Sequence, residues 1–193
     1  LALLDRNGGL IEEKQFEYVV VYDPEGSFIT GAGWFESPAE AVINDLGGKL
    51  KKVKEKAHFG FNSKYAKGKN TPDGSAQFQL KAGELEFNSY ENNWLVVGSD
   101  GTAKYKGKGR IKGDTGDFEF MIYATDNDVK GRANDDRFRI KIWRAGTSET
   151  IYDNGSIDNP DGATTLIGGR SIVVHENKSV KGGSTSSKLI TES

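Results

Sequence analysis

The fold is decided by the stretch Ala103-Lys-Tyr-Lys-Gly-Lys-Gly-Arg-Ile-Lys112, the turn Gly113-Asp-Thr-Gly116, and the stretch Asp117-Phe-Glu-Phe-Met-Ile-Tyr-Ala-Thr125. On each side of the turn, small or apolar residues alternate with charged or polar ones. A period of two is typical of β-strands that bury one face and expose the other. The stretch therefore predicts an antiparallel hairpin.

A four-residue loop fixes the expected register of this hairpin. The pattern pairs Lys112 with Asp117, Ile111 with Phe118, and Arg110 with Glu119. Opposite charges then face each other, and so do apolar residues. Each cross-strand pair of this kind stabilises a sheet by about 0.2–1 kcal/mol.

The same alternation continues along the chain in both directions. Strands are predicted at residues 16–22, 28–35, 57–65, 76–81, 84–88, 94–97, 137–143, 150–153 and 171–175. The one helix signal is the capping box Ser37-Pro-Ala-Glu40, which predicts two turns at most. The fold class is therefore all-β: an antiparallel two-sheet sandwich, jelly-roll-like or immunoglobulin-like, with about nine to twelve strands and at most one short helix.

Glycine is in excess, with 25 of 193 residues against a usual share of ~7 %. Five of these glycines fall inside predicted strands: Gly31, Gly33, Gly60, Gly107 and Gly109. Glycine weakens a strand unless a bulge or a close neighbour requires it. The strand glycines therefore predict a curved sheet in which other groups approach the backbone closely.

The composition excludes several classes of protein. Without Cys, the chain has no disulfide, thiol nucleophile or iron–sulfur cluster. A net charge of −2 argues against a basic nucleic-acid binder, and no apolar run approaches the ~18 residues of a membrane span. No Gly-x-Ser-x-Gly elbow, dinucleotide fingerprint or Walker sequence is present. We therefore expect a protein that is not an enzyme and has neither a nucleic-acid partner nor a membrane span.

Three parts are expected along the chain. Residues 1–15 are predicted to end a preceding module or to form a linker hairpin, and residues 16–176 to form the β domain. Residues 177–193 are polar and rich in Gly and Ser, which predicts a flexible tail.

Several segments resemble a β domain of large secreted bacterial proteins, where it follows PKD-type or other immunoglobulin-like repeats. The resemblance covers residues 16–176 and is carried by Phe16–Pro24, Phe28–Trp34, Ala57–Tyr65, Trp94–Val97, Ala103–Gly109, Asp136–Trp143, Tyr152–Asn154 and Gly168–His175. Residues 3–22 also look like the last hairpin of a PKD-type repeat. The resemblance implies a secreted or cell-surface module whose partners are neighbouring modules of the same chain, and it carries over no catalytic residues.

Acidic and amide residues gather in two predicted loops, at residues 126–136 and 153–161. Clustered oxygen ligands suit Ca²⁺, which takes six to eight of them. Asp126, Asp128 and Asp136 are the predicted ligands of one structural calcium ion. The spacing is not that of an EF-hand, and the same residue types also form turns, so both interpretations stay open.

Basic residues lie on the predicted outer face of the hairpin and of the strand at 137–143. Tyr123, Trp143, Arg139 and Lys108 are predicted to bind an anionic glycan or surface polymer there, with an aromatic ring stacking on a sugar. The alternative is a solvated face whose charges prevent edge-to-edge pairing.

These observations favour a non-catalytic module of a secreted or cell-surface multidomain bacterial protein, with an adhesive or architectural role and a structural calcium ion. The alternative is a carbohydrate-binding module attached to a polysaccharide-active enzyme. An exposed, coplanar aromatic pair favours the alternative, whereas burial of Trp34, Trp94 and Trp143 favours the structural module. A third hypothesis, a hydrolase, requires a cleft that holds convergent carboxylates or His58.

Overall fold

The computed structural model describes residues 2–4, 10–13, 27–66, 68–128, 131, 135–169 and 171–176. The strands are β1 (Ala2–Leu4), β2 (Leu10–Glu13), β3 (Phe28–Ser37), β4 (Glu55–Tyr65), β5 (Pro72–Leu80), β6 (Leu85–Val97), β7 (Thr102–Ile111), β8 (Phe118–Thr125), β9 (Arg137–Arg144), β10 (Thr150–Asp153), β11 (Thr165–Leu166) and β12 (Ile172–His175). One 3-10 turn, η1 (Ala39–Ala41), follows β3. Over the residues that the structure describes, the prediction of an all-β fold with at most one short helix is confirmed. The predicted strand at 16–22 and the tail at 177–193 lie outside the described residues.

A single ten-stranded antiparallel sheet contains every described strand except the β1–β2 hairpin. Strands β3 to β10 pair with their neighbours in chain order, β12 adds to the free side of β3, and β11 pairs with β9. The expectation of two separate sheets is not confirmed, because β6 joins the two halves through continuous pairing with β5 and β7. Register shifts after Ser89 and Asn92 interrupt β6 midway, and such bulges bend a strand and increase its twist.

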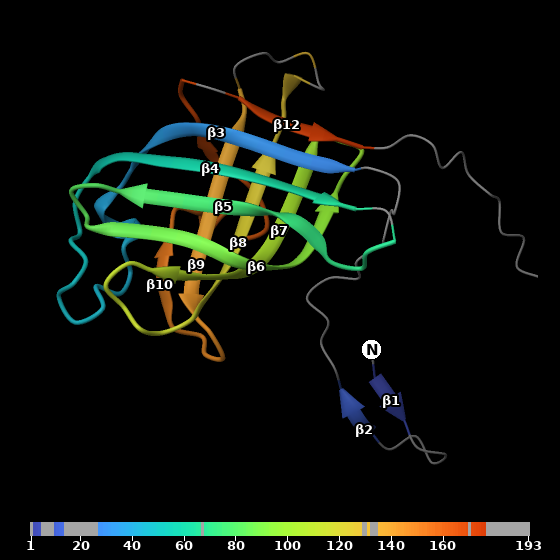
Figure 1. Ribbon diagram of the computed structural model, residues 1–193, viewed down its shortest axis with the longest axis horizontal. Helices are drawn as coiled ribbons and strands as arrows, with labels where there is room; N and C mark the ends of the chain where they lie inside the picture. The colour runs from blue at the N-terminus through green and yellow to red at the C-terminus, as the bar shows by residue number, and fades with distance from the viewer. Residues whose placement is uncertain are drawn as a thin grey trace, which may run out of the picture.

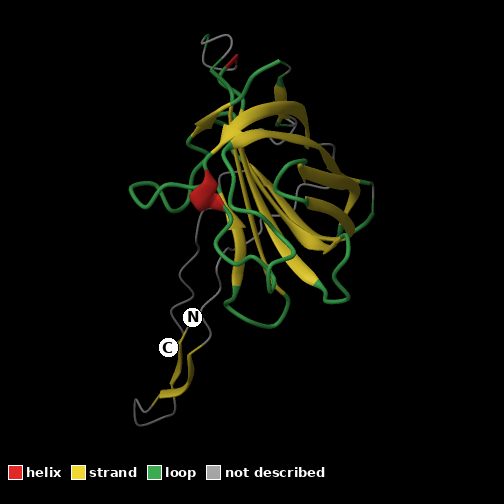
Figure 2. Ribbon diagram, turned by 90° about the vertical axis from the view of Figure 1, so that its left-hand side faces the viewer, coloured by secondary structure: helices red, strands yellow, loops and turns green. Residues whose placement is uncertain are grey.

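The sheet folds over so that its two halves face each other across one core. In Figure 1, β3, β4 and β5 pass in front of β7, β8 and β9, which run steeply behind them. The rings of Phe59 in β4 and Phe138 in β9 stack at 3.9 Å, although these strands are not paired. The ring centres of Phe78 in β5 and Tyr152 in β10, two other strands that are not paired, lie 4.7 Å apart with the rings tilted. Figure 2 shows the strands curving around this shared interior.

The predicted register of the β7–β8 hairpin is wrong by two residues. Phe118 pairs with Gly109 and Glu119 with Lys108, so every side chain keeps its expected face. The end of β7 pairs with β6 and not with β8. Ile111 pairs with Phe87, and the Lys112 amide donates to the Glu86 carbonyl at 2.9 Å. The alternation within the hairpin does not predict this pairing, because it contains no information about the position of β6.

Strand glycines make room for aromatic rings, as predicted. A Cβ at Gly109 would lie 2.3 Å from the Phe87 ring, and one at Gly107 would lie 2.7 Å from the Phe120 ring. A Cβ at Gly31 would meet the Phe61 ring at 2.6 Å. Gly60 is the exception, because nothing lies within 4 Å of its Cβ position.

Both ends of the sheet are capped by neighbouring segments. At β10, Val42 bridges to Tyr152, and the Ile43 amide donates to the Ile151 carbonyl at 2.8 Å. At β12, carboxylates accept the outward amides of Ile172 and Val174. Capped edges resist pairing with another chain.

Candidate functional site

A cavity of about 260 Å³ opens on the outer face of β7, β8 and β9. The alternation that sends Phe120 and Ile122 into the core sends Met121 and Tyr123 to the opposite face. Thr150, the first residue of β10, and two residues of the β9–β10 loop complete the wall. The lining residues are Lys106, Met121, Tyr123, Lys141, Trp143, Thr147, Ser148 and Thr150.

Trp143 forms one wall of the cavity and is half-buried. Its indole Nε1 donates to Glu119 Oε2 at 2.9 Å, and the two residues are direct cross-strand partners. The ammonium groups of Lys106 and Lys141 lie 5.3 and 5.9 Å from the centre of its ring. Both distances are within the range of cation–π attraction, so the cavity combines a fixed aromatic face with two positive charges.

Tyr123 forms another part of the cavity lining and is held by Arg139. The Arg139 guanidinium lies 4.7 Å above the Tyr123 ring and makes a bidentate pair with Asp153, with distances of 2.8 and 2.9 Å. It also donates to the Pro160 carbonyl. Burial disfavours the charge on Arg139, but the Asp153 carboxylate outweighs it and raises the pKa of the guanidinium. Arg139 is therefore a positioning residue, and it does not line the cavity.

Lys108 lies outside the cavity. Its Nζ pairs with Glu91 on β6 at 3.1 Å, and this carboxylate raises the pKa of the ammonium group. Of the four residues predicted to bind a ligand, the structure brings Tyr123 and Trp143 together, while Arg139 and Lys108 serve other contacts. The loop residues Thr147 and Ser148 were not predicted, and the Gly146-Thr-Ser turn was the only signal for them.

Hydrogen bonds within the β9–β10 loop hold this wall of the cavity in place. Arg144 Nε donates to Glu149 Oε2 at 2.8 Å, and the Arg144 amide donates to the Glu149 carbonyl at 2.9 Å. The Thr147 hydroxyl donates to the Arg144 carbonyl and accepts from the Glu149 amide. Asn44 Nδ2 reaches Glu149 Oε1 at 2.7 Å from a distant part of the sequence.

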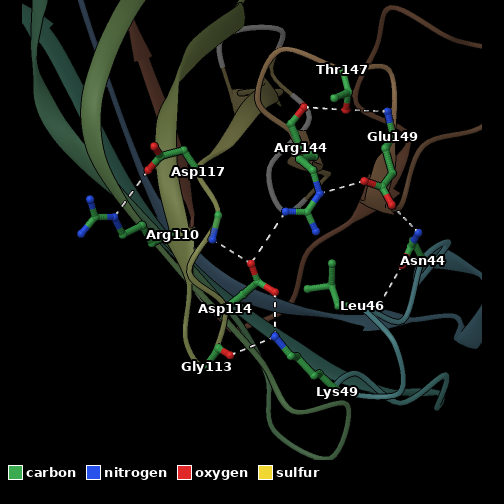
Figure 3. A network of polar contacts seen from close by, with 11 residues as sticks. Asn44, Leu46, Lys49, Arg110, Gly113, Asp114, Asp117, Arg144, Thr147 and Glu149 are labelled. Atoms are coloured by element: carbon green, nitrogen blue, oxygen red, sulfur yellow. Dashed lines mark hydrogen bonds and ion pairs between the residues drawn. The ribbon is translucent and has the colours of Figure 1, made fainter.

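Asp114 extends this network to the β7–β8 loop. Figure 3 shows its carboxylate between Lys49 and Arg144, at 2.9 and 3.8 Å. The Gly116 amide donates to the same carboxylate at 2.8 Å. The hydrogen bond from Lys49, followed by the one from Gly116, lowers the pKa of Asp114. Two loops are thereby joined beside the cavity.

Asp126 and Asp136, two of the predicted calcium ligands, lie together at the edge of β12. Asp136 Oδ2 accepts the Ile172 amide at 2.8 Å, and Asp126 Oδ2 accepts the Val174 amide at 3.0 Å. Their Oδ1 atoms accept the amides of Asn127 and Asp128. Both carboxylates are at most 5 % exposed, so an edge-capping role accounts for their position.

Asp128, the third predicted ligand, is exposed. The described part of the chain holds no group of three acidic, His or Cys side chains arranged to bind a metal ion. Calcium binding by these three residues stays a prediction.

Trp34, Trp94 and Trp143 are all half-buried, so they form neither a fully buried set nor an exposed platform. Trp34 packs beside Gly168, whose Cβ would lie 2.6 Å from the Trp34 ring.

None of the described helices is long and apolar enough to span a membrane. No family model, curated protein or solved structure matches the chain. The resemblance to PKD-associated modules therefore stays a prediction.

Proposed function

We propose that this chain is a non-catalytic carbohydrate-binding module that holds an acidic sugar residue in the cavity beside Trp143. The observation that carries this proposal is the convergence of an indole ring with the ammonium groups of Lys106 and Lys141 in one cavity. Aromatic faces offer flat apolar area to the C–H face of a sugar ring, and ammonium groups attract carboxylate or sulfate.

The surroundings of the cavity suit this ligand class. Glu119 fixes the plane of Trp143 by accepting its N–H, so little side-chain freedom is lost on binding. Ser148 and Thr150 place hydroxyl groups in the lining. The volume is slightly below the usual range of ~300–1,000 Å³ for drug-sized ligands, which favours one sugar ring of a longer chain.

Binding to immobilised acidic and neutral polysaccharides tests the proposal, with polygalacturonate, alginate and chondroitin sulfate against dextran. We expect binding to the acidic polymers that weakens as salt rises, because screening reduces attraction between exposed charges. Trp143→Ala and Lys141→Met should each reduce binding. Lys108→Met removes the same charge outside the cavity and should leave binding nearly unchanged. Equal losses in Lys141→Met and Lys108→Met would mean non-specific charge attraction, which contradicts the proposal.

An architectural module of a secreted or surface protein is the second candidate function. The capping of both sheet edges favours it, because a module in a row of neighbours must avoid pairing with them through its strands. Absence of binding to every acidic and neutral polymer would favour this role over the first.

A further inference from the structure

A polar trough of about 270 Å³ lies on the outer face of β4, β5 and β6, in a different part of the sheet from the cavity. Two cross-strand rows form its surface. One row runs from Gly60 through Gln77 to Asn88, and the other from His58 through Gln79 to Glu86. The neighbouring residues Phe59, Phe78 and Phe87 point the other way and are buried in the core.

The trough exists because residue 60 has no side chain. A Cβ there would meet no atom within 4 Å, although the strand glycines at 31, 107 and 109 each accommodate an aromatic ring. No core contact therefore explains Gly60. A glycine inside a strand often marks a bulge, a tight bend or a place where a ligand approaches the backbone. The register of β4 is unshifted at Gly60 on both sides, so no bulge explains the residue.

The side chains around Gly60 are free to bind a ligand. Within the described residues, His58, Gln77, Gln79 and Asn88 make no side-chain hydrogen bond, and His58 and the three amides are exposed. Each amide offers two donors and an acceptor with two lone pairs. Four uncommitted polar side chains thus surround one gap of molecular size.

The charge of the trough selects the class of ligand. Its one carboxylate, on Glu86, is paired with Lys112 at 2.9 Å, and the three amides are uncharged. Neutral hydroxyl groups complement such a lining better than carboxylate, sulfate or ammonium groups do. We propose that the trough is a second carbohydrate site, which binds a neutral oligosaccharide over Gly60. The trough and the cavity share no lining residue, so this proposal is tested independently of the acidic-sugar site.

The test is an NMR titration of the ¹⁵N-labelled full chain with cellohexaose, laminarihexaose and mannohexaose as probes. We expect at least one hexaose to shift the amide signals of residues 58–60, 77–79 and 86–88 saturably. Gly60→Phe fills the trough with a ring at a position that has space for it, and should weaken binding about tenfold or more. Gly60→Ala adds only one methyl group at the same position, so it should weaken binding less than Gly60→Phe does.

A second variant tests the trough if Gly60→Phe does not fold. Gln77→Ala/Gln79→Ala removes two amides from an exposed face and should also weaken binding about tenfold or more. Trp143→Ala, which disrupts only the cavity, should bind the hexaose as the unaltered chain does. No shift with any of the three hexaoses, or shifts confined to the cavity, would overturn the proposal. Concentration-dependent dimers that Gly60→Phe abolishes would also overturn it, by making the trough a contact between copies.

Discussion

The carboxylate of Asp136 accepts the backbone amide of Ile172 at 2.8 Å, across 36 positions of sequence. This bond, together with that from Val174 to Asp126, satisfies the outward amides of the last strand of the sheet. The loop at 126–136, which the sequence predicts to bind a metal ion, therefore supplies the hydrogen-bond acceptors that a neighbouring strand would otherwise supply at the β12 edge.

Asp136→Ala should destabilise the fold by about 2–4 kcal/mol, because it leaves the buried amides of Ile172 and Asn127 without an acceptor. The change in the free energy of unfolding is measured by urea denaturation. Asp128→Ala is the matched control: it lies in the same loop but is exposed, and should cost no more than about 0.5 kcal/mol. Equal effects of the two substitutions would contradict the capping role of Asp136.

The calcium prediction has a direct test in thermal melting with CaCl₂ and with EDTA. An ion bound to Asp126, Asp128 and Asp136 in the folded state alone raises the melting temperature through linkage. Equal melting temperatures in the two solutions, with millimolar calcium in the first, would count against the prediction.

Alanine should have opposite effects at two strand glycines. At Gly109 a Cβ would meet the Phe87 ring at 2.3 Å and the Asn88 carbonyl oxygen at 2.6 Å, so Gly109→Ala should cost about 1–3 kcal/mol through overpacking. At Gly60 the space is open, so Gly60→Ala should stabilise by about 0.4–1 kcal/mol by restricting the unfolded chain. Urea midpoints measure both, and a loss of stability in Gly60→Ala would show that the trough is not open.

Asp153→Ala should destabilise the fold by about 3–5 kcal/mol, because it leaves the buried Arg139 guanidinium without its carboxylate partner. Arg139→Met/Asp153→Ala removes both charges and should recover part of that loss. A double variant less stable than Asp153→Ala would instead assign the effect to packing of Arg139 on Tyr123.

Asp114 should make the stability of the chain fall at acid pH. Its pKa lies below the ordinary value of 3.8 in the folded state, so its contribution is present above 3.8 and is lost as the pH falls through the lowered value. The effect should be below about 1 kcal/mol, because Lys49 is an exposed partner. Urea denaturation between pH 2 and 6 should show a shallower acid loss in Asp114→Asn. Identical pH profiles would exclude this contribution.

The sequence by itself determined most of the described strands and the faces of their side chains, although it divided β6 into two predicted strands at 84–88 and 94–97 and did not predict β11. Alternation placed Phe118 and Phe120 inside and Tyr123 and Trp143 outside, because side chains on a strand point to opposite faces in turn whatever the strand pairs with. It also marked the strand glycines as places of close approach.

Only the tertiary structure decided which groups meet across the sheet. A shift by two residues keeps every side chain on its face, so the pattern could not separate the predicted pairing of Phe118 with Ile111 from the observed pairing with Gly109. The roles of Arg139, Asp126 and Asp136 also depend on distant partners. Arg139 pairs with Asp153 and does not line the cavity. Asp126 and Asp136 accept backbone amides of β12. Such contacts join residues far apart in the chain, and a local pattern contains no information about which carboxylate will reach which donor.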